Sequence, residues 1–172
     1  KKKKVIAAGP GNPPAFVDET AHLDRAARSI VMGASLDNNI VCVVEKEIIA
    51  VKSIADKLKQ HLGNSGAFLL RDSMIGRLEK AVITKGGPNK DMVGKDAAYI
   101  LKAAGIDVTG DPRIIVPEVD EAHNFVQMEL LMPVIPMVRV VSAAEGIAMS
   151  KRVEHDFRHT AVIHSTNIDN MH

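Results

Sequence analysis

Short apolar runs alternate with amphipathic helical segments along the chain. The clearest helical segment carries apolar residues at i, i+3, i+4, i+7, i+8 and i+11, a spacing that places them on one face of a helix. These residues are Leu23, Ala26, Ala27, Ile30, Val31 and Ala34. Strand-like apolar runs lie between such segments, for example at residues 47–51. Strands that alternate with helices predict an α/β layer fold with a largely parallel sheet.

The other expected elements follow from the same periodicities. Further helices are expected at 53–62, 73–82, 94–104 and 142–153, and strands at 5–8, 40–44, 47–51, 113–116, 134–141 and 161–165. Expected caps are Asp18 or Thr20 for the first helix, Ser53 with Asp56 for the second, and Ser142 with Glu145 for the last. Gly63 and Gly105 are expected to end helices, and the Gly- and Pro-rich residues 9–14 and 84–93 to be irregular.

Charge and composition exclude several classes of function. The chain has 172 residues, which suits one domain or one half of a larger protein, and its 22 basic and 21 acidic residues leave a formal charge of +1. Aromatic residues make up 3%, so neither a basic surface nor stacking platforms favour a nucleic-acid partner. No apolar run approaches the roughly 20 residues that a membrane helix needs. A single cysteine excludes an internal disulfide and a multi-cysteine zinc site.

Cys42 is the first candidate for chemistry because it is the only thiol. It follows the polar residues 37–39 and precedes an apolar run. Taken alone, a single cysteine is more often a small buried apolar residue than a nucleophile. Its surroundings in the sequence therefore have to decide between the two interpretations.

Four stretches of the chain resemble one known family. They are residues 9–21 (GPGNPPAFVDETA), 35–47 (SLDNNIVCVVEKE), 125–136 (FVQMELLMPVIP) and 154–165 (EHDFRHTAVIHS). In this order and over nearly the whole chain, they are similar to the CoA-acylating aldehyde dehydrogenases of ethanolamine and propanediol breakdown. The resemblance implies a three-layer α/β/α catalytic domain and favours Cys42 as the nucleophile.

The resemblance implies a reaction in two halves, with NAD and coenzyme A as cofactor and co-substrate. The Cys42 thiolate attacks a short-chain aldehyde, acetaldehyde or propanal, and loss of hydride to NAD leaves a thioester. The thiol of coenzyme A then removes the acyl group. An unperturbed cysteine is only about 3% thiolate at pH 7, so some local activation is expected. The backbone N–H of Cys42 is implied as an oxyanion donor.

Other positions receive implied roles from the same resemblance. Glu129 matches the glutamate that holds the ribose beside the nicotinamide, although the aromatic residue expected two positions later is Leu131. Gly9 lies in a turn implied to face the substrate or the nicotinamide. Ala8 occupies the place of the glutamate that activates water in hydrolytic relatives, so the thioester is expected to wait for coenzyme A. The glycine-rich turn lacks the spacing of an independent phosphate-binding loop.

The family pattern also sets expectations for organisation. Residues 1–172 are expected to be the thiol-bearing catalytic domain, with the nucleotide-binding domain, the C-terminal arm and any microcompartment-targeting peptide absent, and with little turnover alone. The implied full-length enzyme is a homo-oligomer without nucleic-acid or membrane partners. Its implied location is the cytoplasm, where some relatives enter bacterial microcompartments.

Two other classes of function stay open on the sequence alone. One is a packing or oligomerisation module without chemistry, which an inert and buried Cys42 would favour. The other is a cysteine hydrolase that pairs Cys42 with His22, His61, His123 or His155. The group His155, His159 and His164 is better explained as polar residues at a helix-to-strand junction than as a metal site, so no metal is expected.

Overall fold

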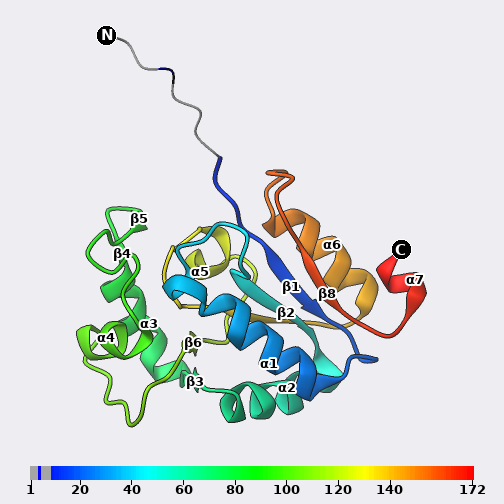
Figure 1. The fold of residues 1–172 in the computed structure, drawn as a ribbon, viewed down its shortest axis with the longest axis horizontal. Helices are drawn as coiled ribbons and strands as arrows, with labels where there is room; N and C mark the ends of the chain where they lie inside the picture. Colours follow the sequence, from blue (N-terminus) through cyan, green and yellow to red (C-terminus); the bar gives the residue numbers. More distant parts are fainter. Residues whose placement is uncertain (1–3, 5–8) are drawn as a thin grey trace.

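A four-stranded parallel sheet forms the centre of the computed structural model, which describes Lys4 and residues 9–172. Its strand order is β7 (Met137–Val140), β2 (Glu47–Val51), β1 (Pro14–Val17) and β8 (Val162–His164) (Figure 1). A second parallel pair, β3 (Ala67–Leu69) and β6 (Ile114–Val116), continues this arrangement, because single bridges join Ile115 to Val134 and Glu118 to Met137. The expected strand at 5–8, including Ala8, lies outside the described residues.

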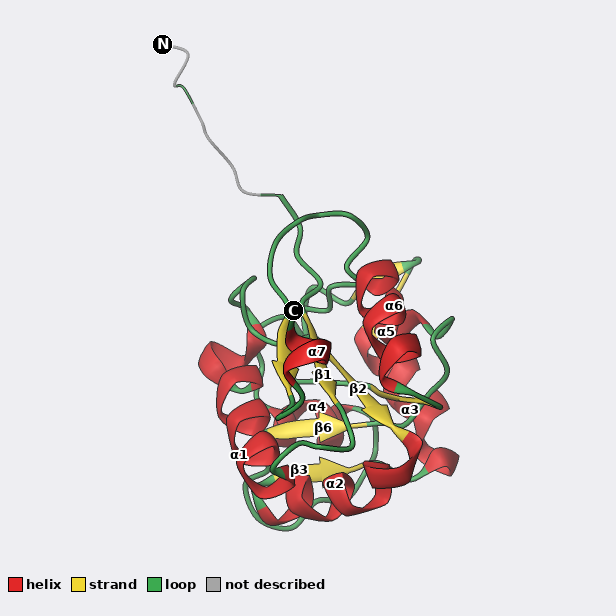
Figure 2. Cartoon of the chain, turned by 90° about the vertical axis from the view of Figure 1, so that its right-hand side faces the viewer, coloured by secondary structure: helices red, strands yellow, loops and turns green. Residues whose placement is uncertain are grey.

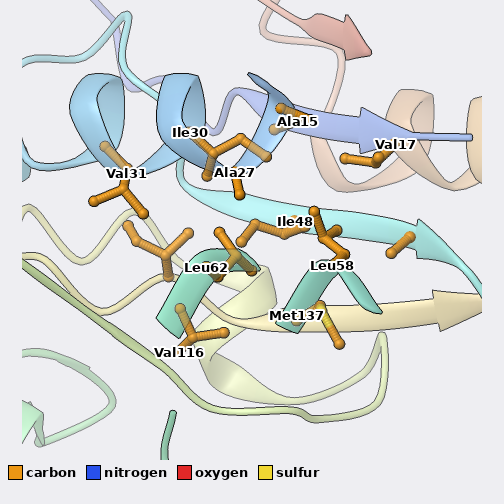
Figure 3. Packing of buried hydrophobic residues seen from close by; sticks show 14 of the residues in the cluster. Ala15, Val17, Ala27, Ile30, Val31, Ile48, Leu58, Leu62, Val116 and Met137 are labelled. Atoms are coloured by element: carbon orange, nitrogen blue, oxygen red, sulfur yellow. The ribbon is translucent and has the colours of Figure 1, made fainter. Parts of the chain in front are cut away.

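Helices cover both faces of the sheet, which gives the expected three layers. On one face, α1 (Leu23–Ala34) and α2 (Lys52–Asn64) pack against Ala15, Val17 and Ile48 (Figure 3). The alternate strand residues Phe16 and Ile49 point the other way, toward α6 (Ala143–Val153). Figure 2 shows α1 and α6 on opposite sides of β1 and β2. The two-residue period of the strands thus supplies two separate cores.

A third apolar core lies beyond β6. It joins α3 (Asp72–Val82), α4 (Ala97–Ala103) and α5 (Asn124–Gln127) through the buried side chains Leu78, Ile100 and Phe125. The short strands β4 (Ile83–Thr84) and β5 (Gly87–Pro88) form a hairpin beside α3. The remaining elements are the 3₁₀ turn η1 (Leu36–Asn39) and α7 (Ile168–Met171). In the described part of the chain, no helix is long and apolar enough to cross a membrane.

The strongest sequence patterns are confirmed. The apolar stripe has the same bounds as α1, and the expected α/β class with a parallel sheet is correct. The Ser142 side chain accepts the N–H of Glu145 at 3.3 Å and so caps α6, while the Glu145 carboxylate accepts the N–H of Val141 at 2.7 Å. These elements were predictable because their signals are local.

Several local predictions are wrong, each for a physical reason. Residues 40–44 are turns, not a strand, because three left-handed residues precede them. β1 begins at Pro14, inside the stretch expected to be irregular, where the missing N–H is tolerated at the first residue of a strand. α2 follows β2 directly, so Val51 precedes it and Ser53 makes no cap.

The expected caps of the first two helices also need correction. Asp18 and Thr20 do not cap α1, which begins after His22 without a side-chain cap. Gly63 lies within α2, and Gly66, with φ +103°, supplies the left-handed residue three positions later. The helix expected at 94–104 begins only at Ala97, with the Asp96 side chain as its cap.

Candidate active site

The segments that precede three parallel strands meet at the amino-terminal edge of the sheet. The backbone N–H of Lys46, just before β2, donates to the carbonyl of Pro13, just before β1, at 2.9 Å. The N–H of Gly11 donates to Oε2 of Glu129, in the segment leading toward β7, at 3.4 Å. Figure 1 shows the loop between α1 and β2 beside the first residues of β1. Cys42 lies in that loop.

The loop before Cys42 has an unusual backbone conformation. Asp37, Asn38 and Asn39 have φ values of 48°, 51° and 66°, in the left-handed region that L-residues seldom occupy. Asn and Asp tolerate this region better than other non-glycine residues. The residue types at 37–39 therefore permit a left-handed turn that a run of ordinary residues would disfavour.

Asn39 holds the left-handed turn in place from inside the molecule. Its side chain is buried, and its Nδ2 donates to the carbonyls of Ala34 at 2.7 Å and Glu45 at 3.0 Å. One contact fixes the end of α1, and the other fixes the segment entering β2. Asn38 adds a bond from Nδ2 to the carbonyl of Gly94 at 3.0 Å. Both ends of the Cys42 loop are consequently anchored.

Lys46 lies on the inside of the same loop. Its side chain is only 3% exposed, and Nζ donates to the carbonyl of Asn39 at 2.8 Å, to Oδ1 of Asn39 at 2.9 Å and to the carbonyl of Val41 at 3.1 Å. Oε1 of Glu129 lies 3.9 Å from Nζ. Burial lowers the pKa of Lys46, and the charges of Glu129, Cys42 and Glu47 oppose that effect.

Cys42 is a free cysteine of intermediate exposure, so it lacks the full burial that would favour the packing-module alternative. A Cβ atom added to Gly11 would lie 2.9 Å from the carbonyl oxygen of Cys42 and 3.1 Å from the ring of His159. Only glycine allows these three segments to approach so closely. The loop of Cys42, the turn at Gly11 and the segment before β8 therefore share one site.

Glu129 and Gly9, the two cofactor residues implied by the resemblance, lie differently. Glu129 contacts Gly11 through Oε2, while its Oε1 accepts no hydrogen bond from the described residues. Gly9 is exposed, and a Cβ on it would lie within 4 Å of no atom in the part of the chain that the structure describes. Gly11, which no sequence motif marked as separate from Gly9, is the glycine that contacts both Glu129 and Cys42.

Two further polar side chains at this edge were not foreseen. Glu47 is fully buried, and neither carboxylate oxygen has a hydrogen-bond partner among the described residues. Burial raises the pKa of Glu47 well above its usual value; nearby Lys46 opposes this and Glu154 adds to it. Asn12 donates from Nδ2 to the carbonyls of Val126 and Val153, both at 2.9 Å. Both lie within the stretches that resemble the family, but the resemblance gave neither of them a role.

A cavity of about 440 Å³ adjoins the site between α6 and β8. Phe16, Ile147 and Val162 provide apolar walls, and His159 lines it on the side of Gly11. The N–H of His159 donates to Oε1 of Glu154 at 2.8 Å, which fixes the backbone there. Cys42 does not line this cavity, and Lys151, Glu154 and Arg158 add charged groups to its wall.

The structure separates the histidines that the sequence brought together. His159 lies at Gly11, whereas His155 is exposed and His164 ends β8 at the opposite edge of the sheet. Over residues 9–172, no group of three or more His, Cys, Asp or Glu side chains is arranged to hold a metal ion. His61 lies 4.0 Å from Asp24 of α1, and His22 and His123 precede α1 and α5.

Known proteins share both the sequence and the fold. No family model matches the chain. An acetaldehyde dehydrogenase (acetylating) of Bilophila wadsworthia is 48% identical over 98% of this chain and 37% of its own length. The crystal structure of Rhodopseudomonas palustris propionaldehyde dehydrogenase with bound CoA and an acylated cysteine is 48% identical, with a TM-score of 0.94 over 98% of this chain and 39% of that one.

A third comparison comes from a microcompartment. A propionaldehyde dehydrogenase of the Clostridium phytofermentans fucose utilisation bacterial microcompartment is 39% identical, with a TM-score of 0.93 over 96% of this chain and 38% of that one. The fold is thus that of an aldehyde dehydrogenase catalytic domain. Within that class the chain is a homologue of the CoA-acylating aldehyde dehydrogenases, which confirms the resemblance. It spans less than two fifths of these relatives' length.

Proposed function

We propose that this chain is the thiol-bearing part of an NAD-dependent, CoA-acylating aldehyde dehydrogenase. The reaction converts acetaldehyde or propanal to the acyl-CoA through a thioester on Cys42. One observation carries the assignment of the nucleophile. The Rhodopseudomonas palustris neighbour bears an acylated cysteine, and Cys42 is the only cysteine of a chain that matches it over 98% of its length. The partly exposed thiol in an anchored loop supports the same role.

In the proposed reaction, Sγ of Cys42 first forms and later loses a bond to the carbonyl carbon of the substrate. The Cys42 thiolate adds to the aldehyde carbonyl carbon, and the resulting oxyanion is stabilised by the N–H of Cys42. A nicotinamide cofactor supplies a hydride acceptor when bound. Loss of hydride from the thiohemiacetal leaves the acyl group on Sγ, and the thiol of coenzyme A displaces Cys42 to give acyl-CoA.

Glu129 fits the role of holding the nicotinamide ribose. A carboxylate accepts hydrogen bonds from hydroxyl groups, and Oε1 of Glu129 has no such donor within the described residues. We place Gly9 in the turn that faces the cofactor or substrate. Its exposed backbone before Gly11 supports that placement.

The proposal extends to organisation and location. We assign residues 1–172 to the catalytic domain and the nucleotide-binding domain to the part of the relatives that this chain does not match, because it spans 37% of the Bilophila enzyme. We propose a homo-oligomeric enzyme of the cytoplasm that works inside a bacterial microcompartment. The Clostridium neighbour, which comes from such a compartment, supports this location.

The deciding experiment is the reverse acyl-transfer step, which needs no nicotinamide. The chain is incubated with propionyl-CoA at high concentration, and its intact mass is measured beside that of Cys42→Ala. We expect one propionyl group on the wild type, removable by hydroxylamine as a thioester, and none on Cys42→Ala. Lack of an adduct on folded wild type whose Cys42 still reacts with iodoacetamide would overturn the assignment of Cys42 as acyl carrier.

A further inference from the structure

Lys46 lies where the two proposed functional side chains meet, yet no step of the reaction uses it. We propose that Lys46 is a positioning residue that holds the Cys42 loop and Glu129 in one arrangement. This inference rests on the roles proposed for Cys42 and Glu129. It assigns to Lys46 neither contact with substrate nor proton transfer.

The hydrogen bonds of Lys46 point to its role as the centre of the loop. An ammonium group has three donors, and the structure gives Nζ three acceptors: the carbonyl and Oδ1 of Asn39 and the carbonyl of Val41. All of them lie in the residues immediately before Cys42. A buried lysine that served only the core would not need every donor directed at one loop.

The positive charge of Lys46 also faces a specific partner, the carboxylate of Glu129. With all three donors used by the loop, Oε1 of Glu129 at 3.9 Å interacts with the ammonium through charge. Glu129 reaches the same region through Gly11, whose position is fixed close to the carbonyl of Cys42. Lys46 therefore connects the loop of the nucleophile with the carboxylate proposed for the cofactor.

A buried ammonium is costly unless it is both paired and hydrogen-bonded. The buried ammonium of Lys46 lies in a loop that already contains three residues in the left-handed region. A methionine has nearly the same length and would fill the same volume without charge or donors. A lysine at such a position is best explained by what the charge and the donors do for the loop.

The test measures the rate at which iodoacetamide alkylates Cys42 in the folded chain. The variants are Lys46→Met, Lys46→Arg, and the matched control Lys57→Met at an exposed position of α2. We expect Lys46→Met to slow alkylation about fivefold or more, because Nζ binds the carbonyl of Val41, one residue before Cys42, and the change removes these hydrogen bonds and the positive charge from the loop. Lys46→Arg should recover much of the rate and Lys57→Met should match the wild type. Equal rates in folded Lys46→Met and wild type would overturn the inference.

Glu129→Gln tests the connection without changing a residue of the Cys42 loop itself, and it serves if Lys46→Met does not fold. Removing the carboxylate leaves the ammonium charge less compensated, so we expect alkylation of Cys42 to become about twofold faster. An unchanged or slower rate in folded Glu129→Gln contradicts the coupling. Circular dichroism and equal alkylation of all variants in denaturant establish that folded chains are compared.

Alkylation separates this inference from the proposed function. Iodoacetamide reacts without acyl-CoA, so a wild type that takes no propionyl group but whose alkylation depends on Lys46 would refute the function and support the positioning role. A wild type that is acylated, with alkylation rates that ignore both Lys46 and Glu129, would support the function and refute the positioning role.

Discussion

The two edges of the parallel sheet bury polar groups in opposite ways. At the carboxyl-terminal edge, the Asp18 carboxylate ends β1 and accepts hydrogen bonds from Thr20, Ser165 and Asn170. At the amino-terminal edge, Glu47 has no hydrogen-bond partner within the described residues, and Asn12 and Glu129 each keep one oxygen without a donor. The first edge satisfies its buried carboxylate, although Nε2 of His164 has no partner there within the described residues, and the second leaves several side-chain oxygens without a donor near Cys42.

This difference teaches where function resides in the fold. Ligands of open α/β sheets usually bind at the carboxyl ends of the strands. Here the carboxyl-terminal edge is held by the hydrogen bonds of Asp18 and by ion pairs from Arg139 to Glu118 and Asp56. The candidate site occupies the amino-terminal edge, where backbone strain and unpaired acceptors gather. Unsatisfied buried groups are uncommon in proteins and mark places that serve something other than stability.

The largest effect is expected from Asn39→Ala at the amino-terminal edge. The change removes the bonds to Ala34, Glu45 and Lys46 and places alanine at φ 66°, so we expect about 3 kcal/mol lower unfolding free energy. Urea denaturation measures it. Asn39→Gly loses the same bonds without the left-handed strain and should be about 1 kcal/mol less destabilised than Asn39→Ala. Equal losses would show that the conformation costs nothing.

A smaller loss is expected from Asp18→Asn at the satisfied edge, about 2 kcal/mol, because an amide nitrogen would face groups that donate to the carboxylate. Burial is the largest influence and raises the pKa of Asp18, but the bonds from Ser165, Thr20 and Asn170 together leave it lowered from 3.8. The contribution of the ionised Asp18 to the unfolding free energy is therefore present above pH 3.8, and it is lost as the pH falls through the pKa of Asp18 in the folded state.

Acid titration of the unfolding free energy checks this sign. Wild type should lose stability relative to Asp18→Asn below pH 3.8, while Asp24→Asn, in an exposed pair with Arg28, should follow the wild type. If Asp18→Asn and wild type lose the same unfolding free energy on acidification, the ionised carboxylate of Asp18 does not contribute to stability.

The smallest effect is a gain, from Glu47→Gln. Because the folded pKa of Glu47 is raised, its contribution to stability is complete below pH 4.5 and is lost as pH rises through the folded value. Gln keeps the shape without titrating, so its advantage over wild type should grow with pH to about 1 kcal/mol or more near neutrality. Urea denaturation across pH measures the gap, with exposed Glu19→Gln as control. A gap that stays constant with pH would contradict a buried, titrating Glu47.

The sequence was informative where the determining forces act locally. The α1 stripe and the Ser142 cap of α6 each lie within a dozen residues, and both were predicted correctly. The strand expected at 40–44 was wrong. A bond from Asn38 to the distant carbonyl of Gly94 and a local bond from Asn39 to the carbonyl of Ala34 hold a left-handed turn that apolar patterning does not reveal.

The site shows the same division. Cys42 and Glu129 could be named from the sequence, as the only thiol and through the family resemblance. The roles of Gly11, Lys46 and Asn12 could not, because each depends on a partner from another segment: Cys42 and His159 for Gly11, Glu129 for Lys46, Val126 and Val153 for Asn12. The spacing of residues along the chain does not predict such contacts.

The pairing of β1 with β8 has a consequence for synthesis on the ribosome. Asp18 and Ser165, which join the ends of these strands, are 147 residues apart. Until β8 emerges, β1 presents an unpaired edge with Ala15, Phe16 and Val17, and such edges invite pairing with other chains. Long-range parallel pairings also form slowly. The nascent chain thus passes through a period in which its central strand is exposed, and chaperone binding during translation would matter most in that interval.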